Sequence, residues 1–141
     1  MESHERQIAA RAVKLLLFDC DGVLADGDLL YGTGGIELKR FSTRDGIGIV
    51  LWNKAGLPCG CISGRTSDAL TRRAAELHFA ELFQGIGRKR DILEEICTRR
   101  KLSSEYVAYI GDDVNDLSLL GKVGLFIAPS DAHEEVRHRA D

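Results

Sequence analysis

Two carboxylates directly follow an apolar segment near the start of the chain. The apolar run within residues 14–19 has the length of a buried strand, and it ends on Asp19 and Asp21, followed by Gly22. Parallel α/β sheets bind their ligands at the carboxyl ends of the strands. Two carboxylates at such a place repel each other unless a cation or a shared proton relieves the repulsion. This segment therefore predicts either a metal site or an acid–base pair with separated pKa values.

Three further segments place reactive side chains at the ends of predicted elements. Ser63 follows the predicted strand 57–62, Lys89 opens the predicted helix 88–101, and Asp112, Asp113 and Asp116 follow the predicted strand 106–110. In an open parallel sheet these ends converge on one edge. The expected site combines several carboxylates with one hydroxyl and one ammonium, a set that suits a phosphoryl group and a hard cation such as Mg2+.

The residue types suggest a role for each group. We expect Asp19 and Asp112 to give oxygen ligands to Mg2+, and Ser63 and Lys89 to offset the charge of the phosphoryl group. Asp19 is the expected nucleophile, which forms an aspartyl-phosphate. We expect Asp21 to protonate the departing oxygen and then to accept a proton from the attacking water.

Asp116 and Asp113 are expected to support this site. Asp116 lies four residues after Asp112, which places both on one face of a predicted helix that runs through residue 120. From there Asp116 would orient Lys89 or the waters of the metal. We assign Asp113 to the same supporting group.

The elements that carry these residues alternate between strand and helix. Strands are predicted at 14–19, 57–62, 79–84, 106–110 and 124–128, and helices at 3–12, 44–55, 66–78, 88–101, after Asp113 and from about 132. Residues 28–41, with glycines at 32, 34 and 35, predict a protruding β-hairpin. This order favours an α/β fold, a Rossmann-like parallel sheet with helices on both faces, in one domain spanning residues 1–141.

Length and charge restrict the classes of partner. The chain has 141 residues, enough for one domain, and its net charge of −3 favours neither nucleic acid nor an anionic membrane. No apolar run approaches the length that spans a bilayer, and residues 1–6 are polar rather than signal-like. We therefore expect a cytoplasmic protein with no nucleic-acid or membrane partner.

The cysteines and one glycine pair favour structural roles. Cys59 and Cys61 share a face of a predicted strand, but no second close pair accompanies them, so all four cysteines, including Cys20 and Cys97, are expected to be reduced and mostly buried. Residues 46–48 read Gly-x-Gly without the third glycine of a dinucleotide fingerprint, which argues against a nucleotide site.

Taken in order, the reactive residues resemble a known set of motifs. Asp19-x-Asp21-Gly22-Val23, Ser63, Lys89 and Gly111-Asp112-Asp113-Val114-Asn115-Asp116 resemble the four motifs of the haloacid dehalogenase superfamily of phosphohydrolases. The resemblance runs from about residue 14 to residue 132. It implies the roles described above, with the main-chain carbonyl of Asp21, rather than its carboxylate, as a metal ligand.

The spacing of the motifs restricts the resemblance to one subgroup of the superfamily. Asp21 and Ser63 are 42 residues apart and Lys89 and Asp112 are 23 apart, gaps too short to hold a separate cap domain. The hairpin, residues 42–48 and residues 107–113 resemble the capless subgroup, whose best-known members are 3-deoxy-D-manno-octulosonate 8-phosphate phosphatases. This resemblance implies Mg2+ as cofactor, a small acidic sugar phosphate as substrate, and a homotetramer in which neighbouring hairpins help to close the site.

The same resemblance implies a set of substrate contacts. Arg65 is the foremost, because a guanidinium matches a carboxylate or phosphate with two hydrogen bonds. Its presence favours the octulosonate over a nonulosonate 9-phosphate, whose phosphatases can carry an acidic residue there. The other implied contacts are Ser42, Thr43, Arg44, Asp45, Gly46, Gly64, Arg73 and Lys89.

Other functions remain open at this point. The substrate alternatives are a nonulosonate 9-phosphate or another small phosphate ester. A catalytically silent oligomerisation module is disfavoured because the nucleophile and metal acids are present, and a phosphomutase would need a cap. Val50 stands where the subgroup often has a basic residue, and the printed sequence ends at Asp141 without the subgroup's arginine-bearing tail. Both departures concern the identity of the sugar rather than the phosphatase core.

Overall fold

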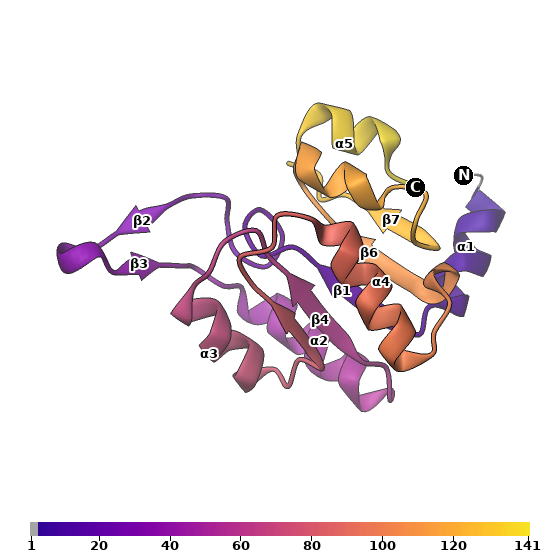
Figure 1. The fold of residues 1–141 in the computed structure, drawn as a ribbon, viewed down its shortest axis with the longest axis horizontal. Helices are drawn as coiled ribbons and strands as arrows, with labels where there is room; N and C mark the ends of the chain where they lie inside the picture. Colours follow the sequence, from indigo (N-terminus) through magenta and orange to yellow (C-terminus); the bar gives the residue numbers. More distant parts are fainter. Residues whose placement is uncertain (1–2) are drawn as a thin grey trace.

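A five-stranded parallel sheet forms the centre of the molecule in the computed structural model, which describes residues 3–141. The sheet order is β5-β4-β1-β6-β7, and every neighbouring pair is parallel (Figure 1). The strands are β1 (Leu15–Phe18), β4 (Cys59–Ile62), β5 (Glu81–Phe83), β6 (Val107–Ile110) and β7 (Leu125–Ile127). The first strand in the chain is central, so its carboxyl end lies between those of β4 and β6.

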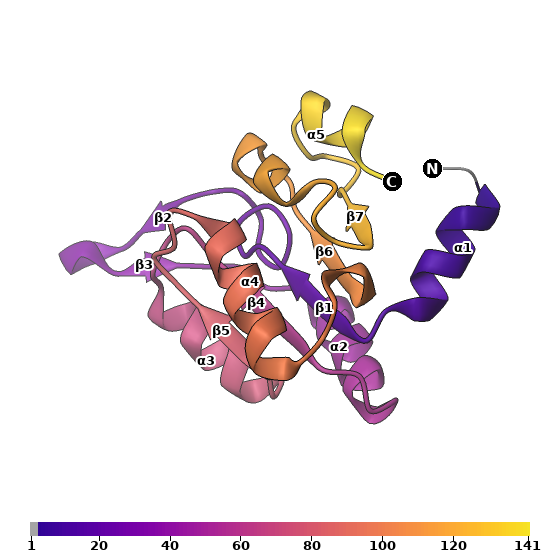
Figure 2. The same ribbon diagram turned by 45° about the vertical axis from the view of Figure 1, so that its right-hand side comes forward.

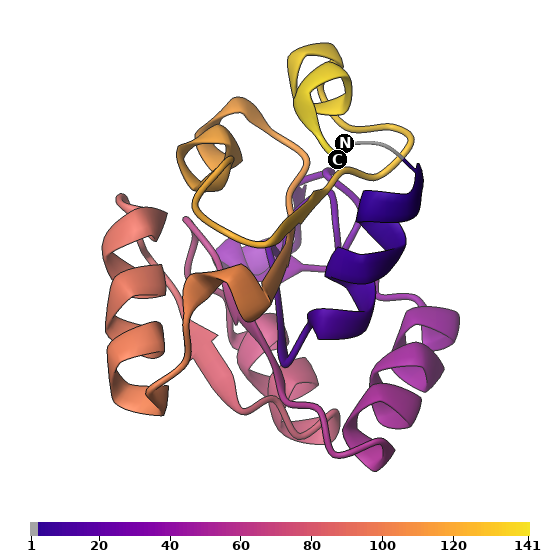
Figure 3. The same cartoon turned by 90° about the vertical axis from the view of Figure 1, so that its right-hand side faces the viewer.

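Helices cover both faces of this sheet. α1 (Ser3–Ala12), α2 (Thr43–Lys54) and α3 (Asp68–Glu76) pack on one face, and α4 (Lys89–Arg100), the 3-10 helix η3 (Val114–Leu119) and α5 (Glu134–Arg139) pack on the other. Figure 3 shows α1 and α2 on the opposite side of the sheet from α4. Strand residues alternate between the two cores: Leu15 and Leu17 contact the α4 side, whereas Phe18 contacts the α2 and α3 side. The predicted α/β class, with helices on both faces, is confirmed.

A β-hairpin protrudes from this body between β1 and α2. β2 (Leu30–Tyr31) pairs antiparallel with β3 (Glu37–Leu38), and the short 3-10 turn η1 (Thr33–Gly35) joins them. Gly34 and Gly35 have positive φ angles of 78° and 80°, which residues with a side chain rarely adopt. Figures 1 and 2 both show the hairpin extending away from the sheet. Within residues 3–141 no further domain is inserted between the elements.

The segment after β6 differs from its prediction. Residues 114–119 form a 3-10 helix rather than an α-helix, and Asp113 is its N-cap. The carboxylate of Asp116 bonds back to the Asp113 amide in a capping box, which tightens this turn. Asp112 lies before the helix, so the prediction that Asp112 and Asp116 share a helical face is wrong. The remaining short 3-10 helix, η2 (Ser104–Tyr106), precedes β6.

The cysteines form no disulfide. Cys20, Cys59 and Cys61 are buried and Cys97 is partly buried, and all four are free, as predicted. Burial raises the pKa of the Cys20 thiol to about 12, which keeps it protonated and unreactive at neutral pH. None of the helices within residues 3–141 has the length and apolar character that crossing a bilayer requires.

The close approach of β4 and β5 provides a test of this packing. A side chain at Gly60 would meet the backbone oxygen of Glu81 at 2.6 Å. We expect Gly60→Ala to lower the free energy of unfolding by about 1–3 kcal/mol, because the added methyl group would meet backbone atoms of Glu81 and one of the two strands would have to shift. Gly48→Ala is the matched control, because its added methyl group meets no atom within 4 Å and lies inside α2. It should raise stability by about 0.5–1 kcal/mol. Urea denaturation measures both; equal effects of the two substitutions would contradict the packing.

Candidate active site

One pocket of about 830 Å³ lies at the carboxyl edge of the sheet. The ends of three adjacent strands meet there: Asp19 follows β1, Ser63 follows β4, and Asp112 follows β6. Lys89, the first residue of α4, enters from the side. The predicted reactive residues therefore converge on one cavity, which Asp21, Gly64, Arg65 and Asp113 also line.

Lys89 is the buried cation of the pocket. Its Nζ lies 2.7 Å from Oδ2 of Asp19, 2.7 Å from Oδ1 of Asp116 and 3.0 Å from the hydroxyl of Tyr109. These three partners use all three N–H donors of the ammonium. Burial alone lowers the pKa of Lys89, but the two carboxylates outweigh burial and raise it above its usual value. Lys89 is therefore a permanent positive charge beside Asp19.

Asp116 holds Lys89 and the loop after β6 together. It is completely buried, and Oδ1 accepts hydrogen bonds from Lys89 and from the Tyr109 hydroxyl, the latter at 2.7 Å. Oδ2 accepts from the amides of Asp112 at 3.0 Å and Asp113 at 3.3 Å. Asp116 thus orients Lys89, and its own lone pairs are occupied. Tyr109 is a member of this network that the sequence analysis missed, because it lies inside a strand that reads simply as apolar core.

Asp112 is a carboxylate of the pocket whose hydrogen bonds are not all formed. Its Oδ1 is buried and has no hydrogen-bond partner among the described residues. Burial raises the pKa of Asp112 to about 7, with further contributions from Asp19, Asp116 and Asp113. One carboxylate oxygen each from Asp19, Asp112 and Asp116 lie within 4.8 Å of one another. Since Asp116 is already occupied, Asp19 and Asp112 are the carboxylates that fit a hard cation such as Mg2+.

Gly22 makes room for Asp112. Its φ angle is +82°, and a Cβ atom there would lie 1.8 Å from Oδ2 of Asp112. The glycine that follows the two acids of β1 is therefore required on two counts, backbone conformation and space. This explains in physical terms why a glycine directly follows Asp21.

Asp19 is held at the end of β1 by an amide and by Lys89. Its Oδ1 accepts a hydrogen bond of 2.6 Å from the Cys20 amide, and its Oδ2 contacts Lys89. Burial raises the pKa of Asp19, and Lys89 offsets part of that rise. The carboxylate faces the pocket with lone pairs left on both oxygens.

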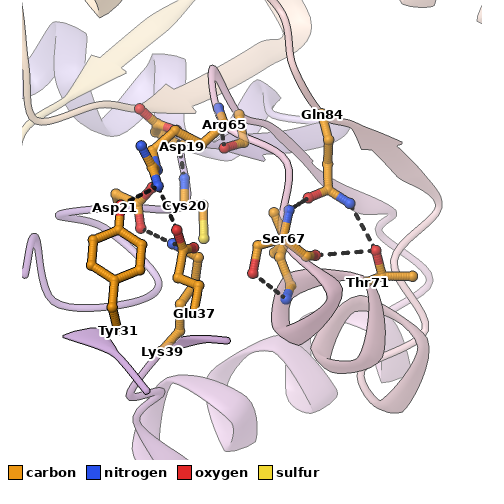
Figure 4. A network of polar contacts seen from close by, with 12 residues as sticks. Asp19, Cys20, Asp21, Tyr31, Glu37, Lys39, Arg65, Ser67, Thr71 and Gln84 are labelled. Atoms are coloured by element: carbon orange, nitrogen blue, oxygen red, sulfur yellow. Dashed lines mark hydrogen bonds and ion pairs between the residues drawn. The ribbon is translucent and has the colours of Figure 1, made fainter. Parts of the chain in front are cut away.

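The Asp21 carboxylate points toward the hairpin rather than toward Asp112. Lys39, just after β3, makes a close ion pair with its Oδ1, and Nε of Arg65 lies 3.9 Å from its Oδ2 (Figure 4). Arg65 also forms a close ion pair with Glu37 and bonds the Tyr31 hydroxyl at 3.3 Å. The sequence analysis missed this hairpin group, although the alternation of residues 36–41 places Glu37 and Lys39 on one face.

Ser63 and Arg65 form the β4 side of the pocket. Ser63 is buried, and its hydroxyl accepts a hydrogen bond of 3.2 Å from the Arg65 amide. The side chain of Arg65 is 44% exposed, so its guanidinium lies at the mouth of the pocket. Ser63 thus faces the interior of the site and Arg65 faces its entrance.

Residues 42–46 and Arg73, which are predicted substrate contacts, do not line the Asp19 pocket of the single chain. Ser42 caps α2 by accepting hydrogen bonds from the amides of Arg44 and Asp45, and Arg73 donates to the Ser42 carbonyl at 3.1 Å. A side chain at Gly46 would meet the Arg73 guanidinium at 2.5 Å. Ser42 and Asp45 line a neighbouring pocket of about 460 Å³, and Thr43, Arg44, Gly46 and Arg73 line neither. Within one chain, Arg73 therefore ties α3 to α2 and does not line the Asp19 pocket, and its contact with a substrate stays a prediction.

Comparison with known proteins identifies the family. A model of the haloacid dehalogenase-like hydrolases matches residues 65–141, more than half of the chain. The chain belongs to the haloacid dehalogenase-like hydrolases. This confirms the resemblance found in the motifs, and the matched residues contain Lys89, Asp112 and Asp116.

Curated relatives of this hydrolase and solved structures of similar proteins agree with one another. The 3-deoxy-D-manno-octulosonate 8-phosphate phosphatases KdsC of Salmonella typhi and Escherichia coli K12 are both 38% identical over 132 residues, covering 94% of this chain and 70% of theirs. A crystal structure of 3-deoxy-D-manno-octulosonate 8-phosphate phosphatase from Moraxella catarrhalis, with magnesium, phosphate and KDO bound, is 32% identical. Its TM-score is 0.95, and the match covers 99% of this chain and 80% of that one. A probable yrbi family phosphatase from Pseudomonas syringae has 40% identity and a TM-score of 0.95, over 98% and 78% of the two chains.

The raised pKa of Asp112 leads to a prediction for the metal-free hydrolase. Because folding raises this pKa from 3.8 to about 7, the folded protein binds the extra proton, and its stability should fall as pH rises from about 4 through 7. Mg2+ binds the ionised form, so the melting temperature gained on adding Mg2+ should be larger at pH 8 than at pH 5.5. Thermal melts with EDTA or with Mg2+ measure both effects.

The matching substitution is Asp112→Asn. It should flatten the fall in stability with pH and remove most of the Mg2+-induced rise in melting temperature. Asp68→Asn, in the exposed first turn of α3, is the control and should behave as the unsubstituted protein. An Asp112→Asn protein that Mg2+ still stabilises fully at pH 8 would show that the cation binds elsewhere.

Proposed function

We propose that this chain is a Mg2+-dependent phosphatase that hydrolyses 3-deoxy-D-manno-octulosonate 8-phosphate to the free sugar acid and phosphate. The observation that carries the proposal is one pocket with Asp19, Lys89 and Asp112 at its base, in a chain 38% identical over 132 residues to phosphatases of that name. The reaction makes it a phosphoric monoester hydrolase, and its sugar acid is a precursor of lipopolysaccharide.

Mg2+ is the cofactor that the site fits. Asp19 and Asp112 would hold it, together with the main-chain carbonyl of Asp21, and the unpartnered Oδ1 of Asp112 supports this assignment. The bound cation supplies positive charge that orients the phosphoryl oxygens and offsets their charge. A magnesium-bound relative from Moraxella catarrhalis and a cobalt-bound one from Haemophilus influenzae also support it.

The chain's own residues carry the two transfer steps. The Asp19 carboxylate attacks phosphorus, the bond from phosphorus to the sugar oxygen breaks, and Asp21 gives that oxygen its proton. A water then attacks the aspartyl-phosphate, Asp21 takes the proton of the water, and Asp19 is released with phosphate. Lys89 contacts Asp19 and Ser63 lines the same pocket, and both would stabilise the negative charge on the phosphoryl group.

Arg65 is the residue we propose for recognition of the sugar acid. Its guanidinium is partly exposed at the pocket mouth, where a carboxylate of the substrate would replace or extend its contact with Glu37. A nonulosonate 9-phosphate is the second candidate substrate, since its phosphoryl group would make the same contacts. Gly64, beside Arg65, also lines the pocket.

We further propose that residues 1–141 form one domain that assembles as a homotetramer in the cytoplasm. The four free cysteines fit a reducing compartment. Assembly is supported by the hairpin, whose apolar side chains Leu29, Leu30, Ile36 and Leu38 are about half exposed or more. An open active site would also gain protection for its acyl phosphate from a covering subunit.

Sedimentation equilibrium tests the assembly. The unsubstituted protein should have the mass of four chains at micromolar concentration, and Leu30→Ser combined with Leu38→Ser should shift it toward smaller species, because these paired side chains are apolar and exposed. Ile8→Ser is the control, an equally exposed apolar residue on α1, at the other end of the molecule (Figure 2). A monomeric unsubstituted protein would contradict the assembly.

A panel of phosphorylated keto-acids and sugars, assayed with Mg2+, tests the function. We expect kcat/KM for the octulosonate 8-phosphate to exceed that for a nonulosonate 9-phosphate by about tenfold or more, a ratio that corresponds to about 1.4 kcal/mol of differential recognition. Asp19→Asn should lower turnover by about 10³-fold or more with the fold intact. Asp68→Asn should leave turnover unchanged. Equal, low efficiency on both sugars would contradict a dedicated sugar phosphatase, and phosphate release by Asp19→Asn at the unsubstituted rate would contradict the mechanism.

A further inference from the structure

The burial of one side chain, that of Lys39, is not explained by the small hairpin that carries it. Its ladder has two residue pairs, Leu30 with Leu38 and Tyr31 with Glu37, and a two-stranded ribbon of this length is marginally stable in water. Yet the side chain of Lys39, directly after β3, is 2% exposed. Lysine is almost never fully buried unless it is paired. The burial of Lys39 therefore needs charged partners, and Glu37 is the one that the hairpin itself supplies.

The partner outside the hairpin is Asp21, the residue we assign as acid and base. Lys39 makes a close ion pair with Oδ1 of Asp21 and a second contact of 3.0 Å with Oε1 of Glu37. Glu37 in turn pairs with Arg65, whose Nε lies 3.9 Å from the other oxygen of Asp21. These four side chains form a closed ring of alternating charge between the hairpin and the pocket (Figure 4).

The two carboxylate oxygens of Asp21 have different partners in this ring. Oδ1 is held by the ammonium of Lys39, whereas the only charged partner of Oδ2 among the described residues is Arg65, a pocket-lining residue at 3.9 Å. The position of a proton-transferring oxygen strongly affects rate, because a displacement of about 1 Å costs on the order of 10²-fold. A carboxylate without this anchor would be free to rotate about its side-chain bonds.

We propose that Lys39 is a positioning residue for the phosphatase reaction: it anchors Oδ1 of Asp21 so that Oδ2 meets the leaving oxygen of the phosphate ester. This inference rests on the proposed function, because it assigns the transferred proton to Asp21. Lys39 itself does not touch the substrate. The alternative is that Lys39 only fastens the hairpin to the body.

The two possible roles of Lys39 can be distinguished by comparing phosphate esters with different leaving groups. A primary alkyl phosphate, such as the octulosonate 8-phosphate, releases a strongly basic alkoxide unless Asp21 protonates it. p-Nitrophenyl phosphate releases a stable phenolate that needs no proton. A misplaced Asp21 should therefore slow the first step with the alkyl ester alone, whereas a loosened hairpin should affect both esters.

The experiment compares Lys39→Met with the unsubstituted protein in single turnovers, with enzyme in excess and Mg2+ present. We expect release of the sugar acid to slow by about 10²-fold, the lower end of general acid catalysis, and release of p-nitrophenol to change by less than about threefold. Lys39→Arg, which keeps a cation, should recover much of the sugar rate. Lys54→Met, at the exposed end of α2, is the control and should match the unsubstituted protein.

Equal losses with the two esters, or no loss with either, would overturn the proposal. If Lys39→Met does not fold, Lys39→Gln takes its place under the same comparison, with a smaller loss confined to the alkyl ester expected. An unsubstituted protein that hydrolyses p-nitrophenyl phosphate but not the octulosonate ester would contradict the proposed substrate only. Ribose 5-phosphate, another primary alkyl phosphate, would then test Lys39.

Discussion

The ammonium of Lys89 lies between two carboxylates, and the arrangement of the site depends on it. Asp19 and Asp116 are each 2.7 Å from its Nζ, and Lys89 and Asp116 are both buried. Removing one partner of a buried ion pair costs about 3–5 kcal/mol, because the other charge is left without compensation. Asp116 also accepts two amides of the loop after β6. The ion pair therefore fixes the start of α4, the end of β1 and the Asp112 loop relative to one another.

The single positive charge of Lys89 does not balance the negative charges of the carboxylates around it. Asp19 and Asp112 share the pocket with Lys89, which is fully used by its three partners, and no donor within residues 3–141 reaches Oδ1 of Asp112. The raised pKa of Asp112 is the consequence, since burial and three neighbouring carboxylates disfavour its charge. A divalent cation relieves both the repulsion and the missing contact. The site is thus held in a form that is unfavourable by itself and suited to Mg2+ and a phosphate ester.

The sequence is sufficient to predict the sheet and the base of the pocket, for a physical reason. Alternating strands and helices place the residues after β1, β4 and β6 on one edge, so the convergence of Asp19, Ser63 and Asp112 follows from topology alone. The contacts of Lys39 and Arg73 could not be found in this way. Each depends on how a long side chain turns toward a segment 18 or 31 residues away, and spacing along the chain carries no information on that direction.

The side chains of β3 and its neighbours alternate between the Asp21 side of the hairpin and the exposed side. Glu37 and Lys39 point to the side of Asp21, and the intervening Leu38, like Ile36, is exposed. A ribbon this short has little stability of its own. Contacts that cover its apolar side chains would therefore also limit the motion of Glu37 and Lys39 on its other side. In the proposed tetramer a neighbouring subunit would hold Lys39 against Asp21 from outside. Assembly and the orientation of the acid–base residue would then be two consequences of one alternating pattern in residues 36–39.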